Sequence, residues 1–98
     1  MPSLPFIESF KDKDPKFYEM INGIQELVNG ESSLDPKTKL MIALAVDAAE
    51  GATQGVATIS DILRNMGVTD EQIAEVLRIT YFAKGNTVLS QSMAAFKK

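Results

Sequence analysis

Apolar residues recur along the chain at the three- and four-residue spacing that places side chains on one face of a helix. The first such series is Phe17, Ile21, Ile24 and Val28. Asp14 and Pro15 come shortly before it, as is typical of a helix N-cap and a first helical residue. Gly30 follows the series and is suited to ending a helix, so the pattern predicts a helix over residues 15–29.

The same start and stop signals predict further helices. Asp35 before Pro36 repeats the opening signal, and Gly51 is suited to a C-cap. Thr69 and Gln72 form a capping-box pattern, in which each side chain accepts a hydrogen bond from the backbone N–H of the other residue. The expected helices cover residues 36–50, 53–66, 70–84 and 87–96, with Gly67 and Gly85 as stops.

The chain carries no signal of β-structure, because no segment alternates apolar and polar residues over a useful length. We therefore expect an all-α fold, a compact bundle of about five helices. Residues 1–13, punctuated by Pro2 and Pro5, are expected to form an extended leader, and residues 14–98 a single domain. A chain this short buries only about two-thirds of its unfolded surface, so we expect oligomerisation to add stability.

Charge and hydropathy argue against two classes of partner. The net charge is -3 at pH 7 and the only arginines are Arg64 and Arg78, which does not suit a nucleic-acid surface. The longest apolar run, residues 40–46, is far shorter than the roughly 20 residues of a membrane span. Residues 1–10 lack the basic region and apolar core of a secretory signal. We expect a cytoplasmic protein that binds neither nucleic acid nor membranes.

The chain contains no cysteine and no histidine. This excludes disulfides, thiol redox chemistry, cysteine nucleophiles and Ser-His-Asp triads, and it removes the usual ligands of zinc. Any catalysis would have to use Asp, Glu, Lys, Tyr, Ser or Thr. We expect neither a cofactor nor a metal site.

Two stretches and the join between them resemble a known family. They are "LDPKTKLMIALAV", which opens the second expected helix, and "NMGVTDEQIAEVL", which links the third to the fourth. In this order and spacing the chain resembles the carboxymuconolactone decarboxylase and alkylhydroperoxidase D-like family, over roughly residues 34–89. The resemblance implies a helical protomer that assembles into trimers or hexamers.

The resemblance also places a reaction site at the join. The peroxidase branch of the family carries Cys-x-x-Cys-x-x-x-His there, with a glutamate twelve residues before the first cysteine. In this chain the corresponding positions are Ala52, Gly55 and Ile59, and the glutamate position is Leu40. The decarboxylase branch lacks the cysteines but keeps a histidine at the position of Ile59. None of these side chains is present, so the resemblance implies the fold and not the activity.

Asp47 and Glu50 are the acidic residues nearest to this position. They are three apart on one helix and therefore share a face, close to a C-terminus where the helix dipole disfavours negative charge. We expect a solvated pair, or partners for Arg64 or Lys84. The alternatives are a paired-carboxylate site for acid–base chemistry or a divalent cation, and a contact between subunits.

Lys84 and the first turn of the third expected helix are the other candidates. Lys84 near the end of its helix suits the dipole, and the alternative is a base or Schiff-base former beside Tyr81. The free N–H groups at Thr53 and Gln54 are a weak candidate for holding a small anion.

These features support three hypotheses on function. The first is a non-redox binding or scaffold homo-oligomer of the family, a trimer or hexamer with a possible small carboxylate ligand. The second is a thiol-independent enzyme, with decarboxylase or lactone chemistry on a small carboxylic acid, that uses Asp47 or Glu50 helped by Tyr81 or Lys84. The third is a helical interaction module unrelated to the family, a monomer that exposes an apolar groove.

Overall fold

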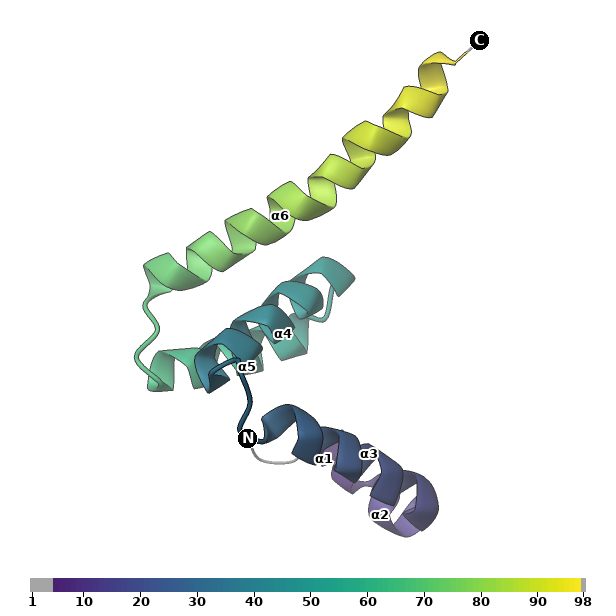
Figure 1. Cartoon of the computed structure of the whole chain (residues 1–98), viewed down its shortest axis with the longest axis vertical. Helices are drawn as coiled ribbons and strands as arrows, with labels where there is room; N and C mark the ends of the chain where they lie inside the picture. The colour runs from purple at the N-terminus through teal and green to yellow at the C-terminus, as the bar shows by residue number, and fades with distance from the viewer. Residues whose placement is uncertain (1–4, 98) are drawn as a thin grey trace. The chain divides into compact units, whose positions relative to one another are not determined.

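The computed structural model of the protein describes residues 5–97, and within this range it contains helices and no strand (Figure 1). The all-α prediction is therefore confirmed. The elements are α1 (Pro5–Glu8), α2 (Phe10–Lys13), α3 (Pro15–Asn29), α4 (Pro36–Glu50), α5 (Thr53–Asn65), α6 (Asp70–Ser92) and a final 3₁₀ turn, η1 (Met93–Phe96).

Contacts within the chain group the elements into two compact units that divide between Leu34 and Asp35. The first unit holds α1, α2 and α3, and the second holds α4, α5, α6 and η1. The grouping of residues 14–98 into one domain stays a prediction.

The first unit differs from the expected extended leader. Residues 5–13 form two short helices, so an extended conformation is wrong for them, and the rest of the expected leader, residues 1–4, lies outside the described residues. Pro5 stands at the first position of α1, where a missing N–H costs nothing and the fixed φ of proline suits a helix. Pro5, which was expected to punctuate an extended segment, therefore begins a helix.

Aromatic side chains hold these short helices against α3. The rings of Phe10 and Phe17 meet edge to face, with centroids 5.8 Å apart. The Tyr18 hydroxyl donates to a carboxylate oxygen of Glu8 at 3.0 Å, and this hydrogen bond raises the pKa of Tyr18. Many large apolar side chains of this unit stay exposed, among them Met20, Ile24 and Leu27.

The starts of α3 and α4 confirm the predicted caps. A carboxylate oxygen of Asp14 accepts from the N–H of Phe17 at 3.3 Å, and one of Asp35 accepts from the N–H of Thr38 at 2.8 Å. In both helices proline occupies the first turn. Local hydrogen-bonding rules were therefore sufficient to place both helix starts.

Glycines end α4 and separate α5 from α6, again as predicted. Gly51 has φ of 76° and Gly67 has φ of 88°, a left-handed conformation that side chains disfavour. The predicted capping box also forms: the Gln72 N–H donates to the Thr69 hydroxyl at 3.1 Å, and the Thr69 N–H donates to the Gln72 side chain at 2.9 Å. These caps fix where α6 begins.

The predicted stop at Gly85 is wrong. The helix α6, 23 residues long from Asp70 to Ser92, runs through Gly85, so the expected fifth helix is the second half of α6 followed by η1. A glycine lowers helix propensity by only about 1 kcal/mol relative to alanine, and no proline follows to prevent continuation. At 1.5 Å per residue α6 is about 35 Å long, and α4, with 15 residues, is about 22 Å.

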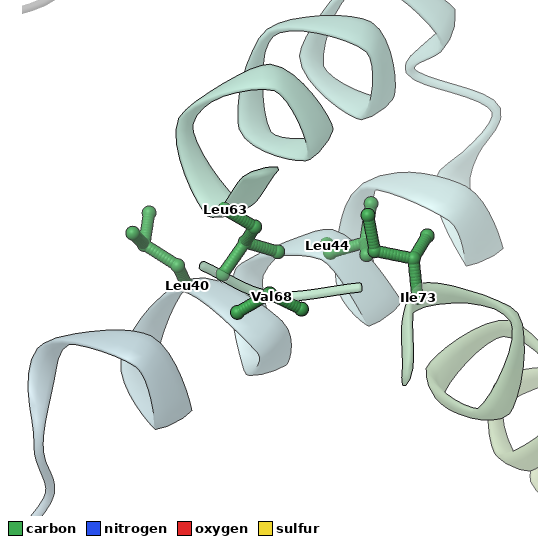
Figure 2. Close-up of a cluster of buried hydrophobic side chains, with 5 residues drawn as sticks. All are labelled: Leu40, Leu44, Leu63, Val68 and Ile73. Atoms are coloured by element: carbon green, nitrogen blue, oxygen red, sulfur yellow. The ribbon is translucent and has the colours of Figure 1, made fainter. Parts of the chain in front are cut away.

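The core of the second unit lies where α4 meets α5 and α6 (Figure 2). Leu44 and Leu63 are fully buried, and Figure 2 shows them with the other members of the cluster. The buried apolar residues are Leu40, Leu44, Leu63, Val68 and Ile73. Among the described residues of α6 only Ile73 is buried, so the core holds the start of this helix and leaves its second half exposed.

The cap at Asp35 gives a prediction with a defined pH dependence. Its hydrogen bond from the Thr38 N–H holds the pKa of Asp35 below the ordinary 3.8. This stabilisation is complete above the ordinary pKa and is lost as the pH falls through the lower folded value. Asp35→Asn keeps a neutral acceptor, so at pH 7 it should lower the melting temperature slightly, and Asp35→Ala by a few degrees.

Between about pH 5 and pH 2 the difference in melting temperature between the wild type and Asp35→Asn should narrow. Scanning calorimetry across this range measures the effect. A difference that stays constant over the range would contradict the role of the charged cap.

Candidate functional site

The join between α4 and α5 is built from backbone hydrogen bonds. The N–H of Ala52 donates to the carbonyl of Asp47 at 2.9 Å, and the N–H of Thr53 donates to the carbonyl of Gly51 at 3.0 Å. Ala52 is the N-cap residue of α5 and provides no side-chain cap. The join therefore turns the chain sharply and brings the last turn of α4 against the first turn of α5.

Two of the positions that the resemblance singled out lie in apolar surroundings. Leu40 is 2% exposed and belongs to the core cluster, and the half-buried Ile59 packs against that cluster. Where the resemblance expects a glutamate and a histidine, this chain has hydrocarbon in contact with Leu44 and its neighbours in the cluster. A polar relay at these two positions would have to be buried among apolar groups.

Asp47 and Gly55 lie directly against each other, which the sequence did not predict. A β-carbon built on Gly55 would lie 2.9 Å from the carboxyl carbon of Asp47 and 3.6 Å from its β-carbon, with a carboxylate oxygen closer still. The Asp47 side chain is half-buried and covers the first turn of α5. The acidic residue of α4 thus occupies the space beside Gly55, where the resemblance expects the second cysteine.

The location of Asp47 explains how a carboxylate is tolerated at the end of a helix. The C-terminus of α4 disfavours negative charge, whereas the first turn of α5 favours it, so the two helix dipoles oppose each other at this group. In the described part of the chain the Asp47 carboxylate has no hydrogen bond or ion pair. Sequence spacing placed Asp47 correctly on α4 and gave no signal that it reaches Gly55.

Glu50 and the predicted cationic partners lie elsewhere. Glu50 is exposed, unlike the half-buried Asp47, so the two carboxylates do not share an environment. Arg64 donates to Asp70 at 2.8 Å and to Asp61 at 3.1 Å, and the bond to Asp70 is the larger cause of the raised pKa of Arg64. Among residues 5–97 no ion pair joins Asp47 or Glu50 to Arg64 or Lys84.

Lys84 lines an open groove of about 740 Å³ between the end of α4 and the second half of α6. It is the one charged side chain among lining residues that are mostly apolar. Asp47 and Glu50 are not among these residues, so the fold separates the predicted acids from Lys84 and Tyr81. The lining residues include Ala48 and Ala49 of α4 and Tyr81, Lys84, Val88 and Leu89 of α6.

The described residues contain neither a cluster suited to a metal ion nor a helix suited to a membrane span. Across residues 5–97, no three acidic side chains come together in a way that could hold a metal ion. Within the same range no helix combines the length and the apolar character needed to cross a bilayer.

Comparison with known proteins supports the resemblance seen in the sequence. The model of the carboxymuconolactone decarboxylase family matches residues 15–98. Two similar proteins come from Methanocaldococcus jannaschii: the uncharacterized protein MJ1511 is 34% identical over 79 residues, 81% of this chain and 74% of that protein. The uncharacterized protein MJ0742 is 27% identical over 89 residues, 90% of this chain and 86% of that protein. No solved structure gives a significant match.

The apolar surroundings of Leu40 predict a large penalty for restoring the expected glutamate. Leu40→Glu would place an unpaired carboxylate in the core and should cost about 3–5 kcal/mol of unfolding free energy at neutral pH. Because the neutral acid is cheaper to bury, the loss should shrink as the pH falls from 7 toward the ordinary glutamate pKa of about 4.3 and level off below it. Urea unfolding measures it, with the near-isosteric Leu40→Met as the control, and equal stability of the two variants at pH 7 would contradict a closed apolar site.

Proposed function

Since the chain belongs to the carboxymuconolactone decarboxylase family, we propose that it is a member without the family's thiol peroxidase chemistry, acting as a cytoplasmic, non-redox binding or scaffold homo-oligomer. The observation that carries the first part is the absence of any cysteine or histidine from the sequence. A thiol peroxidase needs a thiolate to attack the peroxide and a second thiol to resolve the product. This chain supplies neither.

The packing around the expected site supports the same proposal. Leu40 and Ile59 contribute to the core, where a relay glutamate and histidine would be costly to bury unless paired. Apolar side chains at both positions stabilise the fold at the expense of proton transfer. This arrangement suits a protomer that acts by binding or by assembly and not by proton transfer.

Exposed apolar surface on α6 and η1 supports assembly with further copies. Val88 is 65% exposed, Leu89 69% and Phe96 78%, all beyond the part of α6 that the core holds. Side chains of this kind are costly to leave in water and mark interaction surfaces when they gather. We propose that they lie between subunits of a trimer or hexamer.

The groove favours one alternative function. A thiol-independent enzyme acting on a small carboxylic acid would need an apolar pocket with a cation, and Lys84 supplies the cation in a groove of about 740 Å³, within the usual size of ligand pockets. Tyr81 lines the same groove. Asp47 and Glu50 do not, so in this alternative the acid–base work falls on Lys84 and Tyr81 alone.

The peroxidase part of the proposal is tested by peroxide consumption. The purified protein, with or without an added dithiol reductant, should consume hydrogen peroxide or an organic hydroperoxide no faster than buffer does. The control is a known thiol peroxidase under the same conditions. Sustained turnover by this chain would overturn the proposal, since no residue in it can carry out the thiol step.

The oligomer part is tested by light scattering coupled to size exclusion. Wild type should elute with a mass of several protomers, and Leu89→Asp should shift the population toward the monomer because it buries a charge at the proposed interface. Ser90→Asp adds the same charge at a neighbouring residue that does not line the groove and should leave the mass unchanged. A wild-type monomer would contradict the assembly and leave the groove open to the small carboxylate of the alternative.

A further inference from the structure

The backbone conformation at Gly55 does not require a glycine. It lies in the first turn of α5, and the glycines with positive φ in the described chain are Gly51 and Gly67. Any residue could adopt its conformation, and alanine would favour the helix more. The reason for glycine at this position must therefore come from outside α5.

The neighbouring side chain of Asp47 gives that reason. A β-carbon at residue 55 would lie 2.9 Å from the carboxyl carbon of Asp47, closer than real β-carbons approach other atoms. By contrast, a β-carbon on Gly23 of α3 would meet nothing within 4 Å, and one on Gly85 of α6 only a ring carbon of Tyr81 at 4.0 Å. Among the glycines within the long helices, only Gly55 has a neighbouring atom this close.

We propose that Asp47 and Gly55 form a coupled pair, in which the carboxylate of Asp47 fills the space that a side chain at residue 55 would need. The Asp47 side chain, which belongs to α4, then fills the space at residue 55, where the resemblance expects the second cysteine. Restoring a cysteine there requires Asp47 to move or to be replaced. For its biological meaning this inference rests on the proposed loss of thiol chemistry.

The negative charge of Asp47 also disfavours a reactive thiol at residue 55. A carboxylate beside a thiol disfavours the thiolate, the form that reacts. The first turn of a helix ordinarily favours a thiolate, and here Asp47 already provides the negative charge at that turn. The pair therefore disfavours a reactive thiol at residue 55 both by volume and by charge.

The volume effect is tested by a double-mutant cycle of Asp47→Ala and Gly55→Ala, read as melting temperature. The colliding atoms are at the end of an aspartate side chain, which can rotate, so Gly55→Ala should be neutral or slightly destabilising in the wild type. In the Asp47→Ala background it should raise the melting temperature by a few degrees, since only the gain in helix propensity remains.

Two controls separate coupling from general effects. Gly23→Ala, at an open helical position, should raise the melting temperature in both backgrounds by the same amount. Glu50→Ala removes an exposed carboxylate three residues from Asp47 and should leave the effect of Gly55→Ala unchanged. Equal effects of Gly55→Ala with and without Asp47 would overturn the proposal.

The charge effect is tested with a single thiol. The natural chain has no cysteine, so the thiol introduced by Gly55→Cys is the only one that reacts with a disulfide reagent. At pH 7 it should react several-fold faster when Asp47→Ala is also present, and Glu50→Ala should not produce this gain. Equal rates would overturn the proposal. Neither readout depends on peroxide turnover, so a failure here is distinguishable from a failure of the proposed function.

Discussion

The contact of α4 with both α5 and α6 is the interaction on which the second unit depends. Leu44 of α4 and Leu63 of α5 are fully buried, and Ile73 brings the start of α6 to the same cluster (Figure 2). Because interiors are close-packed, this cluster sets how near the helices lie. Together with the tight, backbone-bonded join between them, this packing holds the end of α4 beside the start of α5, where Asp47 approaches Gly55.

The same packing explains why the expected reaction site is closed. The position where the resemblance expects a glutamate is Leu40, which is a member of the cluster, and the position where it expects a histidine is Ile59, which packs on it. Residues that contribute apolar contacts here stabilise the protomer, whereas a proton relay would need buried charge. Packing at these positions requires apolar side chains, whereas a proton relay requires polar ones, and this chain has the apolar side chains.

Beyond the core, the second half of α6 presents a different physical situation. Its apolar side chains are exposed, and the groove beside them is lined mainly by hydrocarbon, with Lys84 as the one charge. Such a surface is costly in water unless something covers it. The proposed assembly would cover it with a neighbouring copy and the alternative with a bound carboxylate, and a groove covered by a subunit is closed to a ligand.

Much of the fold could be predicted from the sequence, because helix starts and stops are local. Asp14, Asp35 and the Thr69–Gln72 box form caps with neighbours within three residues, and Gly51 and Gly67 end their segments by adopting positive φ. The absence of thiol and imidazole is likewise a property of the sequence alone. Local signals failed at Gly85, where helix continuation was only slightly disfavoured, and at Pro5, which begins a helix.

The environment of the candidate site was decided by tertiary structure. Periodicity placed Leu40 and Ile59 on apolar faces, but it could not place Asp47 against Gly55, because they lie on different helices and their approach depends on how α4 packs on α5. It also could not separate Lys84 from Asp47 and Glu50, since the groove that Lys84 lines is formed by residues of both α4 and α6. The sequence determined which groups the protein has, and only the packing of the helices determined which of them meet, because side-chain contacts between helices depend on distances that no local pattern encodes.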